Sequence, residues 1–84
     1  MNYVVNSLAE GEVSVARYYL RRGAYLAAAN RAQTAVKEYR QSPAVEEALS
    51  IMSESYNKLG MTDLSADAQR VLKQSFPNSQ YIKQ

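Results

Sequence analysis

The feature that most constrains this sequence is a single glycine between two stretches of helical periodicity. The first stretch ends on Arg21 and Arg22, which place positive charge where a helix C-terminus is partially negative. Gly23 then supplies the residue type that most readily takes the left-handed conformation closing a helix. Apolar residues resume beyond it at helical spacing: Ala28, Ala29, Ala32, Ala35, Val36 and Tyr39. Because small residues let two helices approach closely, the pattern predicts an antiparallel helical hairpin.

Length and composition bound the class of protein. A chain of 84 residues makes one small domain, and 46% hydrophobic with 21% charged residues is typical of a globular protein. Cysteine and histidine are both absent, which excludes disulfides, thiolate catalysis and zinc fingers. The net charge of +2 is too small to imply a nucleic-acid partner. No apolar run approaches the roughly 20 residues of a membrane span.

Periodicity predicts two helices in the first half of the chain, at about 3–22 and from 25 to 39 or 40. The expected apolar stripe of the first helix is Val5, Leu8, Ala9, Val15, Ala16 and Tyr19. Gly11 lies inside this helix and should cost roughly 1 kcal/mol relative to alanine. No strand pattern occurs anywhere in the sequence.

Two more helices are predicted in the second half. Ser42 is expected to cap the third, with Pro43 at its first helical position, and Gly60 is expected to end it. Thr62 or Asp63 is expected to cap the fourth. The expected apolar stripe of that last helix includes Leu64, Ala68, Val71 and Leu72.

The two halves repeat each other. Tyr19 and Gly23 recur 37 positions later as Tyr56 and Gly60. Helix–turn–helix units of this length are typical of tetratricopeptide repeats. The predicted fold is therefore all-α, with two tetratricopeptide-like helical hairpins stacked as a short solenoid. The expected hairpin repeats span 3–40 and 43–76, and 77–84 is either a tail or the start of a further helix.

The residues offer no catalytic constellation. The eight carboxylates have no base or electrophile beside them, and serine has no histidine to activate it. Three isolated glycines cannot form a phosphate-binding loop. We therefore expect a protein that is not an enzyme and uses no cofactor or metal.

A group of basic residues is open to three interpretations; its members are Arg17, Arg21, Arg22, Arg31, Lys37 and Arg40. In the first, these residues lie on solvated helix faces. In the second, they dock an acidic partner surface. In the third, the hairpin is a DNA-binding helix-turn-helix. The alanine-rich second helix has few side chains for reading bases, which disfavours the third. Among the tyrosines, Tyr18 lies off the packing stripes and is the best aromatic contact candidate.

Several phrases resemble a known family. They are Asn6-Ser7-Leu8-Ala9-Glu10, Glu12-x-x-Val15-Ala16-Arg17-Tyr18-Tyr19, Arg22-Gly23-Ala24-Tyr25 and Ala29-Asn30-Arg31. Together they are similar to the C-terminal repeats of the BamD (ComL) family, the lipoproteins of the β-barrel assembly complex in the outer membrane of Gram-negative bacteria. Gly11 departs from the aromatic residue common at that position in the family.

The resemblance carries functional expectations. It implies the last two of five repeats, with a lipidated cysteine upstream that anchors the protein at the periplasmic face of the outer membrane. It also implies docking to the membrane-proximal POTRA domain of BamA, with BamE nearby. Arg31 matches the family arginine associated with the BamA contact, and Asn30, Arg22 and Tyr18 complete the predicted partner-binding set. Gly23 and Gly60 are the predicted structural turns.

Two further expectations stay open. The alternative function is a generic tetratricopeptide adaptor that holds an extended peptide in a concave groove. A two-repeat chain should also leave apolar surface uncovered around Val4, Val5 and Leu8, and either marginal stability or self-association through this surface is expected.

Overall fold

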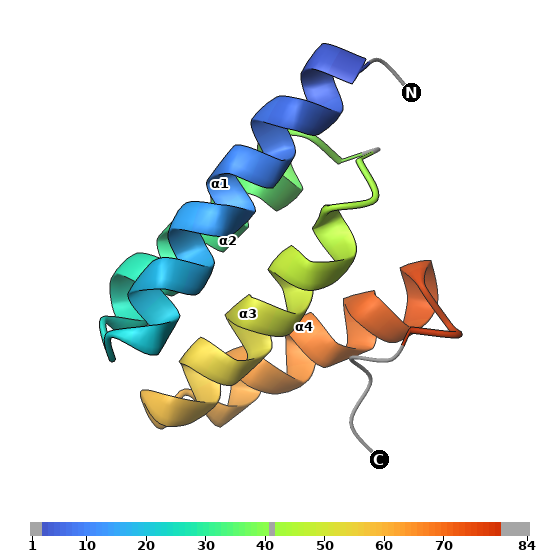
Figure 1. Ribbon diagram of the computed structural model, residues 1–84. Helices are drawn as coiled ribbons and strands as arrows, with labels where there is room; N and C mark the ends of the chain where they lie inside the picture. Colours follow the sequence, from blue (N-terminus) through green and yellow to red (C-terminus); the bar gives the residue numbers. More distant parts are fainter. Residues whose placement is uncertain (1–2, 41, 80–84) are drawn as a thin grey trace.

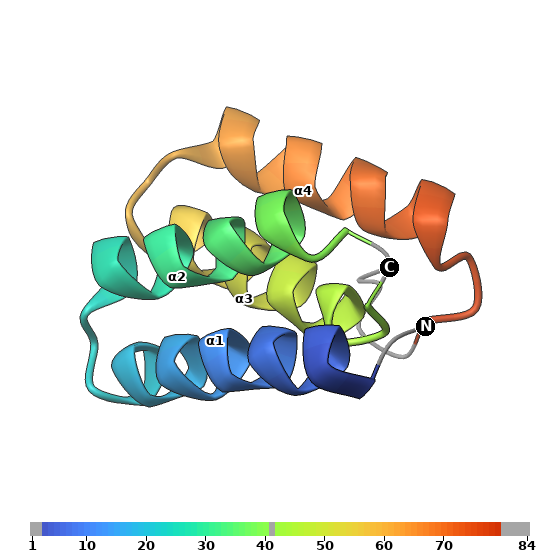
Figure 2. The same cartoon turned by 90° about the horizontal axis from the view of Figure 1, so that it is seen from above.

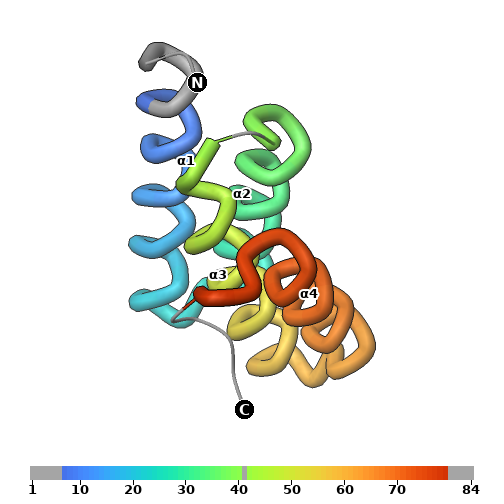
Figure 3. Tube along the Cα trace, turned by 90° about the vertical axis from the view of Figure 1, so that its right-hand side faces the viewer, coloured from blue at the N-terminus to red at the C-terminus, as the bar shows by residue number. Residues whose placement is uncertain are grey.

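The computed structural model describes residues 3–40 and 42–79, with the side chains of α1 described from Ser7 onward. Four helices follow one another in this part of the chain: α1 (Tyr3–Arg21), α2 (Tyr25–Glu38), α3 (Val45–Lys58) and α4 (Thr62–Ser75). The described residues contain no strand, so the all-α prediction is confirmed. Each helix packs against the next, and α1 also touches α3. Figures 2 and 3 place α1 and α4 on opposite sides of the molecule, with α2 and α3 between them. This is a tetratricopeptide-like arrangement of two consecutive helical hairpins (Figure 1).

The same turn closes α1 and α3. Gly23 and Gly60 both have a φ of 80°, in the left-handed region. In each turn the N–H after the glycine donates to a tyrosine carbonyl: Ala24 N to Tyr19 O at 2.9 Å, and Met61 N to Tyr56 O at 2.8 Å. A second bond joins the glycine N–H to the carbonyl three residues earlier. These paired bonds form the Schellman motif. The repeated tyrosine and glycine therefore mark the same backbone bonds in both hairpins.

The starts of α3 and α4 differ from the sequence-based prediction. The residue that precedes α3 is Ala44, so Pro43 lies outside the helix. The Ser42 hydroxyl instead accepts a hydrogen bond from the Ala44 N–H at 3.1 Å, within a turn that leads into the helix. Neither Thr62 nor Asp63 caps α4, because the helix already begins at Thr62 and no side chain bonds to its first turn. The cap position is held by Met61, whose side chain is not one of the usual capping acceptors.

Two apolar clusters hold the helices together. The first joins α1, α2 and α3 through residues that are mostly alanine: Val13, Ala16, Ala28, Ala32, Ala35, Ala48 and Ile51. The second joins α3 to α4 through Val45, Leu49 and Leu72. α3 contributes to both clusters and is the central element of the fold. The alanine-lined cluster explains how α1, α2 and α3 lie so close together.

The predicted stripe of α1 is partly wrong. Ala9 and Ala16 are buried as expected, but the valine that joins them is Val13, while Val15 is 38% exposed and Leu8 is 52% exposed. Leu8 and Val15 lie on a second face of α1, and no other helix of the described chain covers it. Likewise, Leu64 and Val71 of α4 remain about half exposed.

Substitutions at the turn glycine Gly23 and at the helical glycine Gly11 should change the free energy of unfolding in opposite directions. Gly23→Val should lose roughly 1 kcal/mol or more, because a β-branched residue is strained at a φ of 80°. Gly11→Ala should gain roughly 0.5–1 kcal/mol, because Gly11 is helical and its added Cβ would meet nothing within 4 Å. Urea unfolding of both variants measures this. Equal stability of the Gly23→Val and wild-type chains would mean that the turn between α1 and α2 does not depend on a left-handed residue at position 23.

The second face of α1 predicts self-association. With the 37-residue repeat offset, Leu8 and Gly11 correspond to Val45 and Ala48, which are 5% and 0% exposed in the second hairpin. The equivalent face of α1 is open, and Val4 and Val5, also expected there, have side chains outside the described part. We expect concentration-dependent association that Leu8→Glu weakens and that Leu26→Glu, at an exposed site on α2, does not. Sedimentation velocity of the three chains gives the answer; a wild-type monomer at millimolar concentration would contradict it.

Candidate docking surface

Tyr18 lies in the last turn of α1, Arg22 directly follows the helix, and their side chains lie next to each other. Tyr18 is half exposed, and the Arg22 guanidinium carbon lies 5.6 Å from the centre of its ring. The Tyr19 ring packs against the Tyr18 ring edge to face, with centroids 5.8 Å apart. This stack results from the four-residue spacing of Tyr18 and Arg22, which places them on one helix face. It is an aromatic and cationic patch that solvent reaches, and such patches suit protein contacts.

Arg31 lies on α2, facing α1. Its Nη1 is 3.7 Å from Oε1 of Glu12 on α1, and its side chain remains 50% exposed. At this distance the contact is an ion pair without a hydrogen bond. Asn30 is exposed, and its backbone carbonyl accepts a hydrogen bond from the Thr34 hydroxyl at 3.1 Å.

The structure places the four predicted partner-binding residues in two pairs. Glu12, which holds Arg31, precedes Tyr18 by six residues, or about 9 Å along the axis of α1. Both pairs belong to the α1–α2 hairpin. Sequence reasoning missed Glu12, although residues at similar distances before and after Gly23 face each other in an antiparallel hairpin.

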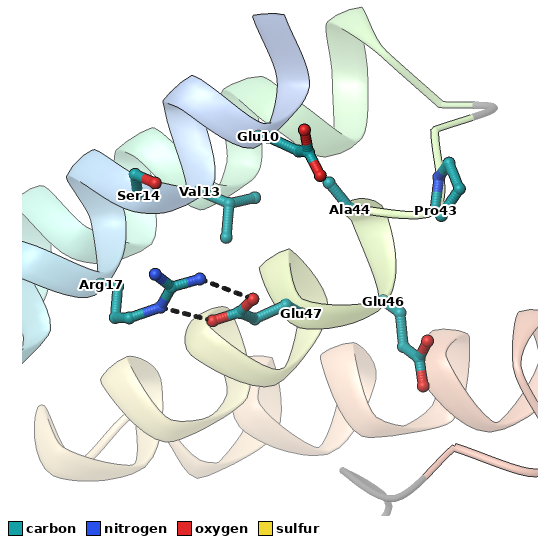
Figure 4. A pocket seen from close by; sticks show the side chains of 8 residues that line it. All are labelled: Glu10, Val13, Ser14, Arg17, Pro43, Ala44, Glu46 and Glu47. Atoms are coloured by element: carbon teal, nitrogen blue, oxygen red, sulfur yellow. Dashed lines mark hydrogen bonds and ion pairs between the residues drawn. The ribbon is translucent and has the colours of Figure 1, made fainter. Parts of the chain in front are cut away.

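A second ion pair links the two hairpins across a hollow. Arg17 of α1 donates to Glu47 of α3 through Nε and Nη2, both at 2.7 Å (Figure 4). The hollow between these helices has a volume of about 440 Å³ and is lined by Glu10, Val13, Ser14, Arg17, Pro43, Ala44, Glu46 and Glu47. Sequence reasoning had placed Arg17 in a basic group and did not connect it with Glu47. No local signal reveals their pairing, because they lie 30 positions apart.

An apolar groove runs between α2 and α4. Its volume is about 220 Å³, and its lining is Gln33, Val36, Leu49, Met52, Tyr56, Leu64, Asp67, Ala68 and Val71. This groove explains the exposure of Leu64 and Val71, which sequence reasoning had placed on a packed face. Nothing in the groove is arranged for catalysis. Within residues 3–40 and 42–79, no three acidic side chains come together as metal ligands would.

Three arginines of the described chain differ in how many of their guanidinium donors are already paired with a carboxylate. Arg17 is bound by two short hydrogen bonds to Glu47, and Arg70 pairs with Asp67 on its own helix. Arg31 has one long contact, at Nη1. Its Nε and Nη2 atoms, the pair of donors that Arg17 uses for Glu47, have no partner among the described residues. Arg31 can therefore accept a further carboxylate in the planar two-bond geometry that arginine favours.

Comparisons with known proteins agree with this scaffold-like surface. Residues 1–72 match the model of the family YfiO, described as outer membrane lipoprotein. Over 79 residues, the chain is 49% identical to the outer membrane protein assembly factor BamD of Neisseria meningitidis serogroup A, covering 94% of this chain and 30% of that protein. Over 72 residues it is 38% identical to the BamD of Haemophilus influenzae, covering 86% of this chain and 28% of that protein.

These comparisons also set the scale of the chain. It spans about 30% of the length of the Neisseria relatives that it matches. The names of the family and of the relatives describe a lipoprotein and an assembly factor, in agreement with the expectation of a non-enzymatic protein. No helix in the described part of the chain combines the length and the hydropathy needed to cross a membrane.

Proposed function

Since the chain belongs to the YfiO family of outer membrane lipoproteins, we propose that it is a docking module for outer-membrane protein assembly. In this proposal the α1–α2 hairpin binds the membrane-proximal POTRA domain of BamA, and BamE lies nearby. The module acts at the periplasmic face of the outer membrane and is held there by the lipid anchor of the longer protein. Its chemistry is recognition of one protein surface by another.

The observation that carries this proposal is the state of Arg31. Its side chain is half exposed, and its single contact, with Glu12, is 3.7 Å long. A planar guanidinium in this state favours an acidic partner residue, which would complete its hydrogen bonds. Tyr18 and Arg22 lie on the same hairpin and add aromatic area to the contact. The resemblance of the Asn30-Arg31 phrase to the family supports the same assignment.

The hollow between α1 and α3 favours a second candidate function. Three glutamates and Arg17 line it, together with Val13, Pro43 and Ala44. A mixed polar and apolar hollow between two hairpins suits a short extended peptide, as a generic adaptor would hold. This candidate requires peptide binding at the hollow, on the α3 side of α1, whereas the docking proposal requires binding at the Arg31 side.

A titration of the chain separates the two functions. The probes are the folded POTRA domain of BamA and a set of short unstructured peptides of mixed charge. Docking predicts measurable affinity for the folded domain that weakens as salt rises, because the partner's acidic groups are screened. The adaptor function predicts that peptides bind and that the folded domain does not. Absence of binding to the folded domain in low salt would overturn the docking proposal.

A further inference from the structure

The carboxylate of Glu12 lies in an unusual environment. Its side chain is only 24% exposed, and its Oε2 atom is buried without a hydrogen-bond partner in the described chain. Buried carboxylate oxygens are normally hydrogen-bonded, so an oxygen left without a donor needs an explanation. The other oxygen, Oε1, faces Arg31 at 3.7 Å. The packing of α1 against α2 thus fixes the negative charge of Glu12 beside a guanidinium that solvent still reaches.

We propose that Glu12 is the positioning residue for Arg31 in partner docking. This inference rests on the proposed function, in which Arg31 meets a carboxylate of the partner. Glu12 attracts the Nη1 side of the guanidinium and so keeps the long arginine side chain over the α1–α2 boundary. The Nε and Nη2 donors are then directed outward, and the partner's carboxylate approaches them from the side away from Glu12.

The long Glu12–Arg31 contact suits this role better than a tight one. A short two-bond pair, such as the one between Arg17 and Glu47, would use the donors that docking needs. A free arginine would lose its rotamer freedom on binding, and this loss opposes association. The ion pair at 3.7 Å restricts the side chain before docking and leaves the Nε and Nη2 donors open. Preorganisation of this kind improves affinity without adding a contact.

A double-mutant cycle in binding tests the inference. Its chains are wild type, Glu12→Gln, Arg31→Ala and the double variant, each titrated with the POTRA domain of BamA. Glu12→Gln should weaken binding by about 3- to 10-fold, the effect expected for one arginine side chain that is no longer ordered beforehand. In the Arg31→Ala background the same change should have no effect, because Glu12 acts through Arg31. Glu10→Gln, also on α1 but facing the α3 hollow, is the matched control and should bind as wild type does.

A measurement on the free chain checks the same inference without a partner. The order parameter of the Arg31 Nε–H group, from nitrogen-15 relaxation, should fall in Glu12→Gln and stay unchanged in Glu10→Gln. Circular dichroism melting of the variants should match wild type. An unchanged order parameter, tighter binding of Glu12→Gln, or a Glu12→Gln effect that persists without Arg31 would each overturn the positioning role. If Arg31→Ala itself binds as wild type does, the proposed function fails; if Arg31→Ala weakens binding and Glu12→Gln does not, only this inference fails.

Discussion

Replacing Arg31 by glutamate is expected to abolish measurable binding to the POTRA domain of BamA. Truncating one member of a desolvated charge pair typically costs about 2 to 5 kcal/mol, since the other charge is left without its partner. A reversed charge adds repulsion to this loss. Arg31 is half exposed and belongs to neither apolar cluster, so helix content and melting temperature should stay close to wild type. Isothermal titration calorimetry and circular dichroism of the same preparations measure both quantities.

Two further substitutions make the Arg31 experiment specific. Arg31→Lys should restore binding only in part, because lysine keeps the charge and lacks the planar pair of donors. Arg40→Ala, in the exposed turn after α2, removes an equal charge away from the contact and should have little effect. Wild-type affinity of Arg31→Glu would remove Arg31 from the docking site. A collapsed fold in that variant would assign Arg31 a structural role instead.

The largest expected loss of stability comes from Leu72→Ala. Leu72 is 0% exposed and is the residue through which α4 enters the cluster with Val45 and Leu49. Removing a buried leucine side chain typically costs about 2 to 5 kcal/mol, because the lost apolar burial is joined by the cost of a cavity. Total stabilities of small domains are about 5 to 15 kcal/mol, so this change should remove a large fraction of the chain's free energy of unfolding.

Val71→Ala is the matched control for Leu72→Ala. The two residues are adjacent on α4, but Val71 is 41% exposed because it faces the groove beside α2. Its replacement should cost well under half as much as that of Leu72. Urea denaturation followed by circular dichroism gives both free energies of unfolding. Equal losses in the two variants would mean that α4 does not pack through the face that carries Leu72.

The positions of the helices and of their glycine turns could be predicted from the sequence because the signals for them are local. Gly23 and Gly60 end helices by their own backbone preference, and the alanines of α2 indicate a packed face by their spacing alone. Both signals depend on residues a few positions apart. All four helices therefore lie where periodicity predicted them, with ends that differ by a few residues. The start of α3 shifts by two residues, from the expected Pro43 to Val45, and Ser42 caps the turn that precedes the helix.

The burial of α1 and the pairing of its charges could not be predicted in the same way. Val13 and Val15 are both apolar and both fit a helical spacing with nearby residues, so periodicity alone does not decide which of them is buried. The decision comes from where α2 and α3 lie in space. The ion pairs of Glu12 and Glu47 could not be predicted for the same reason, because each glutamate contacts an arginine on another helix. The division into two repeats and the partner-binding role of Tyr18, Arg22, Asn30 and Arg31 stay predictions.

The two hairpins are joined by two kinds of contact that respond differently to salt. On the side of the hollow, α1 and α3 are joined by a partly exposed ion pair, whose attraction weakens as salt screens it. Along the line where α2 meets α3, the contact is made by alanines and Ile51, and salt does not screen apolar packing. Raising the ionic strength should therefore weaken the Arg17–Glu47 pair and leave the apolar packing of α2 on α3 unchanged.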